Sequence, residues 1–142
     1  MAKLRDILGI NARSADYLRQ NSKRARKRAD NKLLTKRLLR LAQIPHPRLL
    51  SRLKNRKAVE KFNWPSLEGG FVIKPVQGFG GRGVLVVKKK LPDGEKWVAV
   101  DGKMISGADF KFHSLDIIEG RYSRNGLSDA AMVEERVKIH PK

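Results

Sequence analysis

Four glycines within six residues mark the middle of this sequence. They lie in the segment FVIKPVQGFGGRGVLVV, residues 71–87, between two short runs of strand-forming residues. Glycine adopts positive φ angles and lets backbone N–H groups approach an anion closely, which is how polypeptides cradle phosphates. Each glycine also costs backbone entropy that a plain hairpin need not lose, so a hairpin without a ligand is the less favoured interpretation. The segment predicts a β-hairpin whose loop contacts phosphate through Gly78, Gly80, Gly81 and Gly83.

The context of these glycines differs from that of the common phosphate loops. Gly78, Gly80 and Gly83 match the spacing G-x-G-x-x-G, but a strand follows them where a dinucleotide-binding motif needs a helix. A Walker A loop ends in a lysine and a hydroxyl residue, and Val84 follows the last glycine instead. A kinase-type loop has its lysine on the following strand, whereas Lys74 precedes this loop. An ammonium on the entering strand can hold phosphate oxygens from one side while the loop closes over them.

The segment before the hairpin has a helical pattern followed by an extended one. Leucines recur at helical spacing after Asp30, which we expect to cap a helix that Pro45 and Pro47 end. A short extended segment is predicted over residues 48–53, and a weaker helix over residues 54–62.

The segment after the glycine loop contains strand patterns and one further helix. Strands are predicted over residues 84–88, 96–100 and 130–139. Ser106 and Asp109 form a capping box that predicts a helix over residues 106–119. Together with the first half, this predicts an α+β protein.

The histidines and tryptophans give no functional signal of their own. His46, His113 and His140 are far apart and lack the spacing of a helical metal pair, so we expect surface or turn residues and no metal site. Trp64 and Trp97 are expected to pack in a core, because aromatic residues make up only 6% of the chain and do not alternate with its basic run.

The charge is high and unevenly distributed. The net charge is +18, and residues 1–60 carry +14 of it, from 18 Lys/Arg and four acids. Such a balance suits a polyanionic partner. The densest part, Lys23 to Arg28, has no apolar periodicity, so a solvated helix or loop is the favoured interpretation, ahead of a nucleic-acid contact or an anionic lipid surface. Without cysteines, and with no aliphatic run longer than residues 84–87, a soluble cytoplasmic protein is expected.

Five sequence motifs resemble a known family. The sequence KPVQGFGGRGV at residues 74–84, preceded by DNKLLTK at 30–36 and IPHP at 44–47, is similar to the ATP-grasp fold of carboxylate–amine ligases. The start, ILGINAR at 7–13, together with EERV at 134–137, is closest to the alpha-L-glutamate ligase-like branch. The resemblance covers nearly the whole chain. It implies an α+β fold of ATP-grasp type, with a basic N-terminal part (residues 1–50) and the small ATP-binding lobe up to the adenine linker (residues 51–142).

The resemblance assigns roles to individual residues. Lys32 and Lys74 match the family's two phosphate-contacting lysines, and Gly78 to Gly83 match the loop that folds over the β- and γ-phosphates of ATP.

Glu134 to Val137 match the linker that contacts adenine. By analogy, the Glu135 carbonyl and the Val137 N–H read the adenine edge while Glu134 supports them. Without the family, a solvent-facing acidic pair would be the preferred interpretation of Glu134 and Glu135.

The family's chemistry is ATP-dependent. A substrate carboxylate attacks the γ-phosphate, and an amine then displaces the acylphosphate to give an amide, while Mg²⁺ ions neutralise the phosphate charge. The family holds these ions on a C-terminal lobe that we expect outside this chain, because the acids after the glycine loop are scattered. We therefore expect the N-terminal portion of such a ligase, incomplete as it stands, with Asn31 replacing an expected acid.

Two other interpretations stay open. The first is a small basic RNA-binding or ribosome-associated protein that uses Lys23 to Arg28. The second is an inactive remnant that binds nucleotide without turnover.

Overall fold

A six-stranded antiparallel sheet forms the body of the protein. The computed structural model describes residues 10–123 and 126–138. The strands lie side by side in the order β1-β6-β2-β3-β4-β5. Their bounds are β1 Leu49–Leu53, β2 Phe71–Pro75, β3 Leu85–Lys90, β4 Lys96–Ala99, β5 Met104–Ser106 and β6 Ala131–Glu135. The last strand thus inserts between β1 and β2, which joins the two halves of the chain in one sheet.

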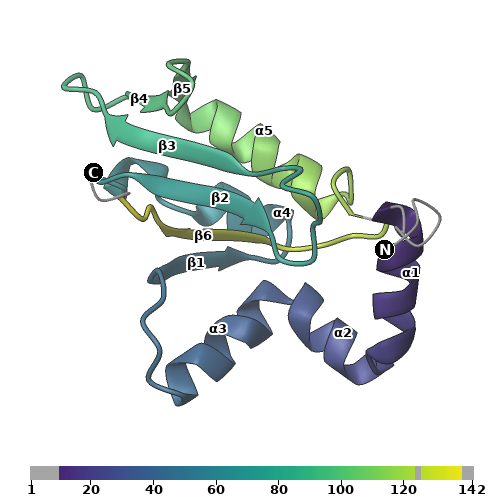
Figure 1. Ribbon diagram of the computed structural model, residues 1–142. Helices are drawn as coiled ribbons and strands as arrows, with labels where there is room; N and C mark the ends of the chain where they lie inside the picture. The colour runs from purple at the N-terminus through teal and green to yellow at the C-terminus, as the bar shows by residue number, and fades with distance from the viewer. Residues whose placement is uncertain (1–9, 124–125, 139–142) are drawn as a thin grey trace, which may run out of the picture.

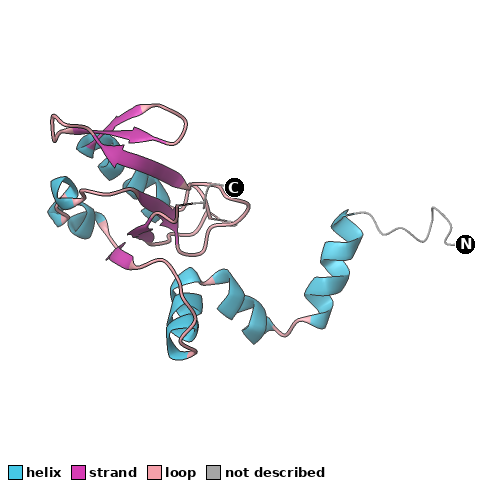
Figure 2. Cartoon of the chain, turned by 60° about the vertical axis from the view of Figure 1, so that its left-hand side comes forward, coloured by secondary structure: helices cyan, strands magenta, loops and turns pink. Residues whose placement is uncertain are grey.

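Helices lie against the sheet and beside its β1 edge. They are α1 Ile10–Gln20, α2 Lys23–Asp30, α3 Lys32–Leu41, α4 Arg56–Lys61 and α5 Gly107–Ile118, with a 3-10 turn at Trp64–Ser66. α4 and α5 cover one face of the sheet, and α1, α2 and α3 form an arc below β1 (Figure 1). Figure 2 shows α1 and α2 extending away from the sheet. None of the helices in the described ranges is long and apolar enough to cross a membrane.

The strand and helix predictions for residues 48–119 are confirmed in position and type. The capping box is present: the Ser106 hydroxyl accepts from the Asp109 N–H at 3.3 Å, and the Asp109 carboxylate accepts from the Ser106 N–H at 2.8 Å. Sequence reasoning missed β5, whose three residues are too short to show an alternating pattern.

The predicted ends of α3 are wrong. Asn31, not Asp30, is the cap, because its side-chain oxygen accepts from the N–H groups of Leu33 and Leu34 at 3.1 and 3.0 Å. Asp30 instead ends α2, which leaves Asn31 as the single residue between two helices. The helix ends at Leu41 before either proline, and Gln43 takes a left-handed φ of 56°.

Several expectations fall partly or wholly outside the described residues. They are the end of the predicted strand at Ile139, His140, and the first part of the motif at residues 7–13. The division at residue 50 stays a prediction, and β1 spans it.

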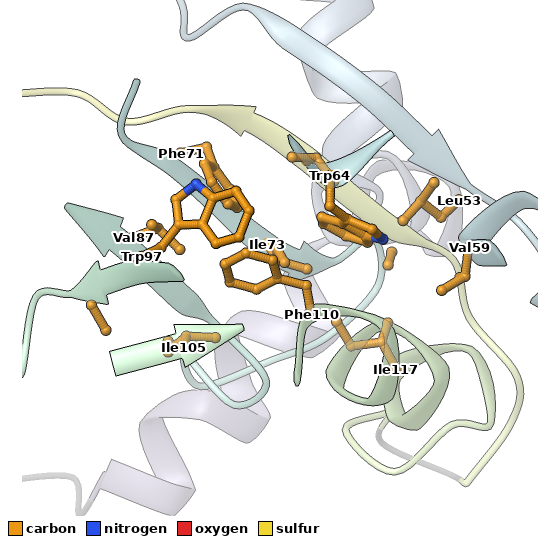
Figure 3. Packing of buried hydrophobic residues seen from close by; sticks show 13 residues of the cluster. Leu53, Val59, Trp64, Phe71, Ile73, Val87, Trp97, Ile105, Phe110 and Ile117 are labelled. Atoms are coloured by element: carbon orange, nitrogen blue, oxygen red, sulfur yellow. The ribbon is translucent and has the colours of Figure 1, made fainter. Parts of the chain in front are cut away.

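The core is built around one phenylalanine. The ring of Phe110 on α5 lies 5.3 Å from Trp64, 5.2 Å from Phe71 and 5.1 Å from Trp97, measured between ring centres (Figure 3). All four side chains are at most 1% exposed, so the expected packing role of both tryptophans is confirmed. Edge-to-face contacts between these rings add to the free energy of burial.

We expect the substitution Phe110→Ala to lower the free energy of unfolding by about 3–5 kcal/mol, because it removes the ring that three aromatic side chains contact. Phe112, on the same helix and 70% exposed, supplies the matched control, and Phe112→Ala should change stability by less than about 0.5 kcal/mol. Urea unfolding followed by tryptophan fluorescence measures both. Equal effects of the two substitutions would contradict this account of the core.

Candidate functional site

The face of the sheet opposite α5 carries an apolar strip beside lysines. Side chains alternate along a strand, so the burial of Phe71, Ile73 and Pro75 against the core places Val72 and Lys74 on the other face of β2. Val72 pairs with Val86 on β3, and both are only half-buried. This face therefore offers two neighbouring valines to a flat apolar group, with a cation next to them.

A buried carboxylate organises the lysines on this face. Glu134 on β6 is 3% exposed and forms ion pairs with Lys74 on β2 and with Lys36 on α3, whose Nζ lies 2.8 Å from Glu134 Oε2. A solvent-facing acidic pair is therefore wrong for Glu134, although Glu135 is partly exposed and pairs with Arg48 at 2.6 Å. A buried charge is costly unless it is paired, so Glu134 holds both lysines in place.

Sequence reasoning missed Lys36. A signal was available, because Lys36 lies four residues after Lys32 and thus on the same side of α3. Lys36 also donates to the Pro47 carbonyl, which attaches the end of the α3–β1 connection to the same cluster.

Lys32 is attached to the base of the glycine loop. It is the first residue of α3, and its Nζ donates to the Gly78 carbonyl at 2.8 Å and to the Val76 carbonyl at 3.4 Å. Burial, and then the neighbouring charge of Lys74, lowers the pKa of Lys32 from its usual 10.5, and nearby carboxylates oppose this shift only in part. Two like charges 42 positions apart in sequence have thus been brought together at the start of the loop, and an anion would relieve their repulsion.

The glycine loop turns through positive φ angles. Gly80, Gly81 and Gly83 have φ of 58°, 72° and 71°, a region that side chains other than glycine's rarely adopt. Hydrogen bonds from the Arg82 N–H to the Phe79 carbonyl and from the Val84 N–H to the Gly81 carbonyl shape the turn. No atom lies within 4 Å of where a Cβ of Gly80 or Gly81 would stand, so the tip of the loop is open.

The far end of the loop is attached to α5. His113 Nε2 donates to the Gly83 carbonyl at 3.0 Å, and a Cβ on Gly83 would lie 2.6 Å from the Tyr122 ring. The expectation that His113 is a surface or turn residue is therefore wrong, because α5 places it half-buried behind the loop. No group of three or more potential metal-ligating side chains occurs within residues 10–123 and 126–138.

The predicted adenine linker starts at the end of β2 that is remote from the loop. In the β2–β6 pairing, Phe71 lies opposite Glu135 and Pro75 opposite Ala131, so β2 runs from the linker toward the loop. The Glu135 N–H donates to the Arg48 carbonyl at 2.9 Å. Val137 is 65% exposed, and its N–H has no partner in the part of the chain that the structure describes. The fold thus places Lys32, Lys74, the glycine loop and residues 134–137 around one face.

Comparison with known proteins identifies the family. The sugar-transfer associated ATP-grasp family matches residues 12–142. The chain belongs to this family. No curated protein and no solved structure matches the chain. The predicted membership of the ATP-grasp superfamily is confirmed, and the alpha-L-glutamate ligase-like branch stays a prediction.

In this ATP-grasp chain, Gly83→Ala should destabilise the fold more than the same change at Gly94. Both glycines have φ near 70°, so alanine costs about 1–2 kcal/mol at either position. Only at Gly83 does the new methyl group meet a ring, and displacing Tyr122 should add about 1–3 kcal/mol. Chemical unfolding of the two variants measures the difference, and equal losses would show that Tyr122 does not constrain the loop.

His113 should make stability depend on pH. Burial is the main cause that lowers the pKa of folded His113 from its usual 6.5. Below pH 6.5 the unfolded chain therefore binds a proton that the folded chain resists, so the free energy of unfolding falls as the pH drops from 6.5 toward the folded pKa. Urea titrations between pH 7.5 and 5 should show this slope diminished in His113→Gln and kept in His46→Gln. An unchanged slope in His113→Gln would contradict the buried position of the imidazole.

Proposed function

We propose that this chain is the ATP-binding portion of an ATP-dependent ligase that joins a carboxylate to an amine. The observation that carries the proposal is the juxtaposition of Lys32 and Lys74 at the base of the glycine loop, in a chain of the ATP-grasp family. In this reaction a carboxylate oxygen attacks the γ-phosphorus and ADP leaves, and the amine nitrogen then displaces phosphate from the acylphosphate.

The phosphates would bind between the two lysines and the loop. Lys74 is held by Glu134 and Lys32 by the Gly78 carbonyl, so both ammonium groups are positioned before a nucleotide arrives. The open tip at Gly80 and Gly81 lets backbone N–H groups approach the β- and γ-phosphates, as the family's loop does.

The base would bind over the opposite end of β2. Val72 and Val86 supply an apolar surface, and the unpaired Val137 N–H supplies a donor for a ring nitrogen. By the resemblance to ATP-grasp ligases, we assign the Glu135 carbonyl as the hydrogen-bond acceptor for the same edge of the base. β2 spans about 16 Å between the linker and the loop, a length that an extended nucleotide can bridge.

The substrates are proposed from the family and the resemblance. The family's description associates it with sugar transfer, which supports a carboxylate or amine carried on a sugar or on a group attached to one. The similarity of EERV at 134–137 and ILGINAR at 7–13 to the alpha-L-glutamate ligase-like branch supports glutamate or another amino acid as the second reactant.

We propose that the reaction uses Mg²⁺ but that the described residues do not supply its ligands. Mg²⁺ prefers several converging oxygen ligands, and no such cluster exists among the described side chains. Those residues therefore do not fit a metal site, and we assign magnesium ligands to none of them.

A second candidate function is binding of RNA through α2. All five basic side chains of Lys23–Asp30 lie on a helix with no buried residue, and four of them are exposed. Binding of this kind depends on phosphate neutralisation and weakens steeply with salt.

Calorimetry of ATP binding, with magnesium present, tests the proposed nucleotide site. The variant Lys74→Gln removes one ammonium of the site, and Glu134 keeps its ion pair with Lys36, so the buried carboxylate is not left unpaired. We expect it to weaken ATP binding at least about tenfold, the effect of losing one charged hydrogen bond.

Lys57→Ala, on the opposite face at α4, is the matched control and should bind as the parent chain does. ATP bound equally well by Lys74→Gln would contradict the site. RNA bound tightly at low salt, and lost when Lys23 to Arg28 are neutralised, would favour the second candidate.

A further inference from the structure

A cavity lined by basic side chains lies between α3 and β1. Its volume is about 500 Å³, within the range of small-molecule sites. Six of its lining residues are cationic or can become so: Lys36, Arg37 and Arg40 on α3, His46 in the connection, and Arg48 and Arg52 at β1. None of its lining residues is acidic.

Of the five Lys and Arg side chains in this lining, two have ion-pair partners and three do not. Lys36 pairs with Glu134, and Arg48 pairs with Glu135 at the predicted linker. Arg37, Arg40 and Arg52 form no ion pair within the described ranges. Three exposed guanidinium groups thus line one concavity without an ion-pair partner among the described residues, and an anion bound between them would reduce their mutual repulsion.

We propose that this cavity binds a small polyanion, a molecule with at least two phosphate or carboxylate groups on a compact body. A guanidinium presents a rigid fork of donors that matches either group in a bidentate arrangement. Leu33 and Leu49 also line the cavity and would contact the uncharged part of the ligand. His46 Nδ1 donates to the Ile44 carbonyl at 3.0 Å, which holds the imidazole at the edge of the cavity.

This site is distinct from the proposed nucleotide site. Its lining includes neither Lys32, nor Lys74, nor any residue of the glycine loop; the two sites meet only at Glu134, which pairs with Lys36 in the cavity and with Lys74. The inference therefore stands whether or not the chain binds ATP. It also gives a role to part of the N-terminal positive charge that the nucleotide site leaves unused.

Calorimetry with two probes, inorganic pyrophosphate and citrate, tests the cavity. At about 0.15 M salt the screening length is about 8 Å, so diffuse attraction to the basic chain contributes little. We expect saturable binding of at least one probe, weakened about tenfold or more in Arg40→Gln/Arg52→Gln. Preference for pyrophosphate identifies a phosphorylated ligand, and preference for citrate a polycarboxylate.

Two controls separate the cavity from other anion sites. Arg24→Gln/Arg28→Gln removes the same charge from exposed positions on α2 and should leave binding within about twofold. Lys74→Gln, which removes an ammonium of the proposed nucleotide site and leaves Glu134 paired with Lys36, should still bind the probe. The proposal is overturned if neither probe binds, if the two arginine pairs weaken binding equally, or if the Lys74 variant alone abolishes it.

Discussion

The buried carboxylate of Glu134 is the constraint on which the arrangement of the site depends. It lies on β6 between β1 and β2, where its charge has to be matched within the protein. Lys74 comes from the neighbouring strand and Lys36 from α3, so satisfying one carboxylate fixes a helix against the open face of the sheet. Leu33 on α3 packs beside Val76 and Met132 and supports the same contact with apolar surface. The ion pairs of Glu134 and this apolar contact thus position α3, the sheet, Lys36 and Lys74 relative to one another.

The glycine loop is free at its tip and fixed at both ends. At its start Lys32 holds the Gly78 carbonyl, and at its end His113 holds the Gly83 carbonyl while Tyr122 fills the space beside Gly83. The first attachment comes from the open face of the sheet, and the second from α5, whose Phe110 is the centre of the core. A loop fixed in this way can close over a ligand without losing its register. The core helix therefore takes part in positioning the candidate site.

Much of the local structure could be predicted from the sequence because its signals are local. The hairpin around the glycines, the capping box at Ser106 and the helix after Asn31 each depend on residues within a few positions of one another. The start of α3 is not decided by the local sequence, because Asp30 and Asn31 are both good caps and the choice depends on how α2 runs into the next helix. The pairing of Glu134 with Lys36 and of Arg48 with Glu135 joins residues 98 and 87 positions apart, and no local pattern contains it.

The sequence by itself determined the elements, the glycine loop and the excess of positive charge, because backbone preference and composition are properties of short segments. Only the tertiary structure decided where that charge is neutralised and where it is not. By inserting β6 between β1 and β2, the fold buries Glu134 beside Lys36 and Lys74, and it leaves Arg37, Arg40 and Arg52 around a cavity with no ion-pair partner among the described residues. The physical reason is that the energy of a charge depends on its distance from other charges and on its burial. The strand order sets both.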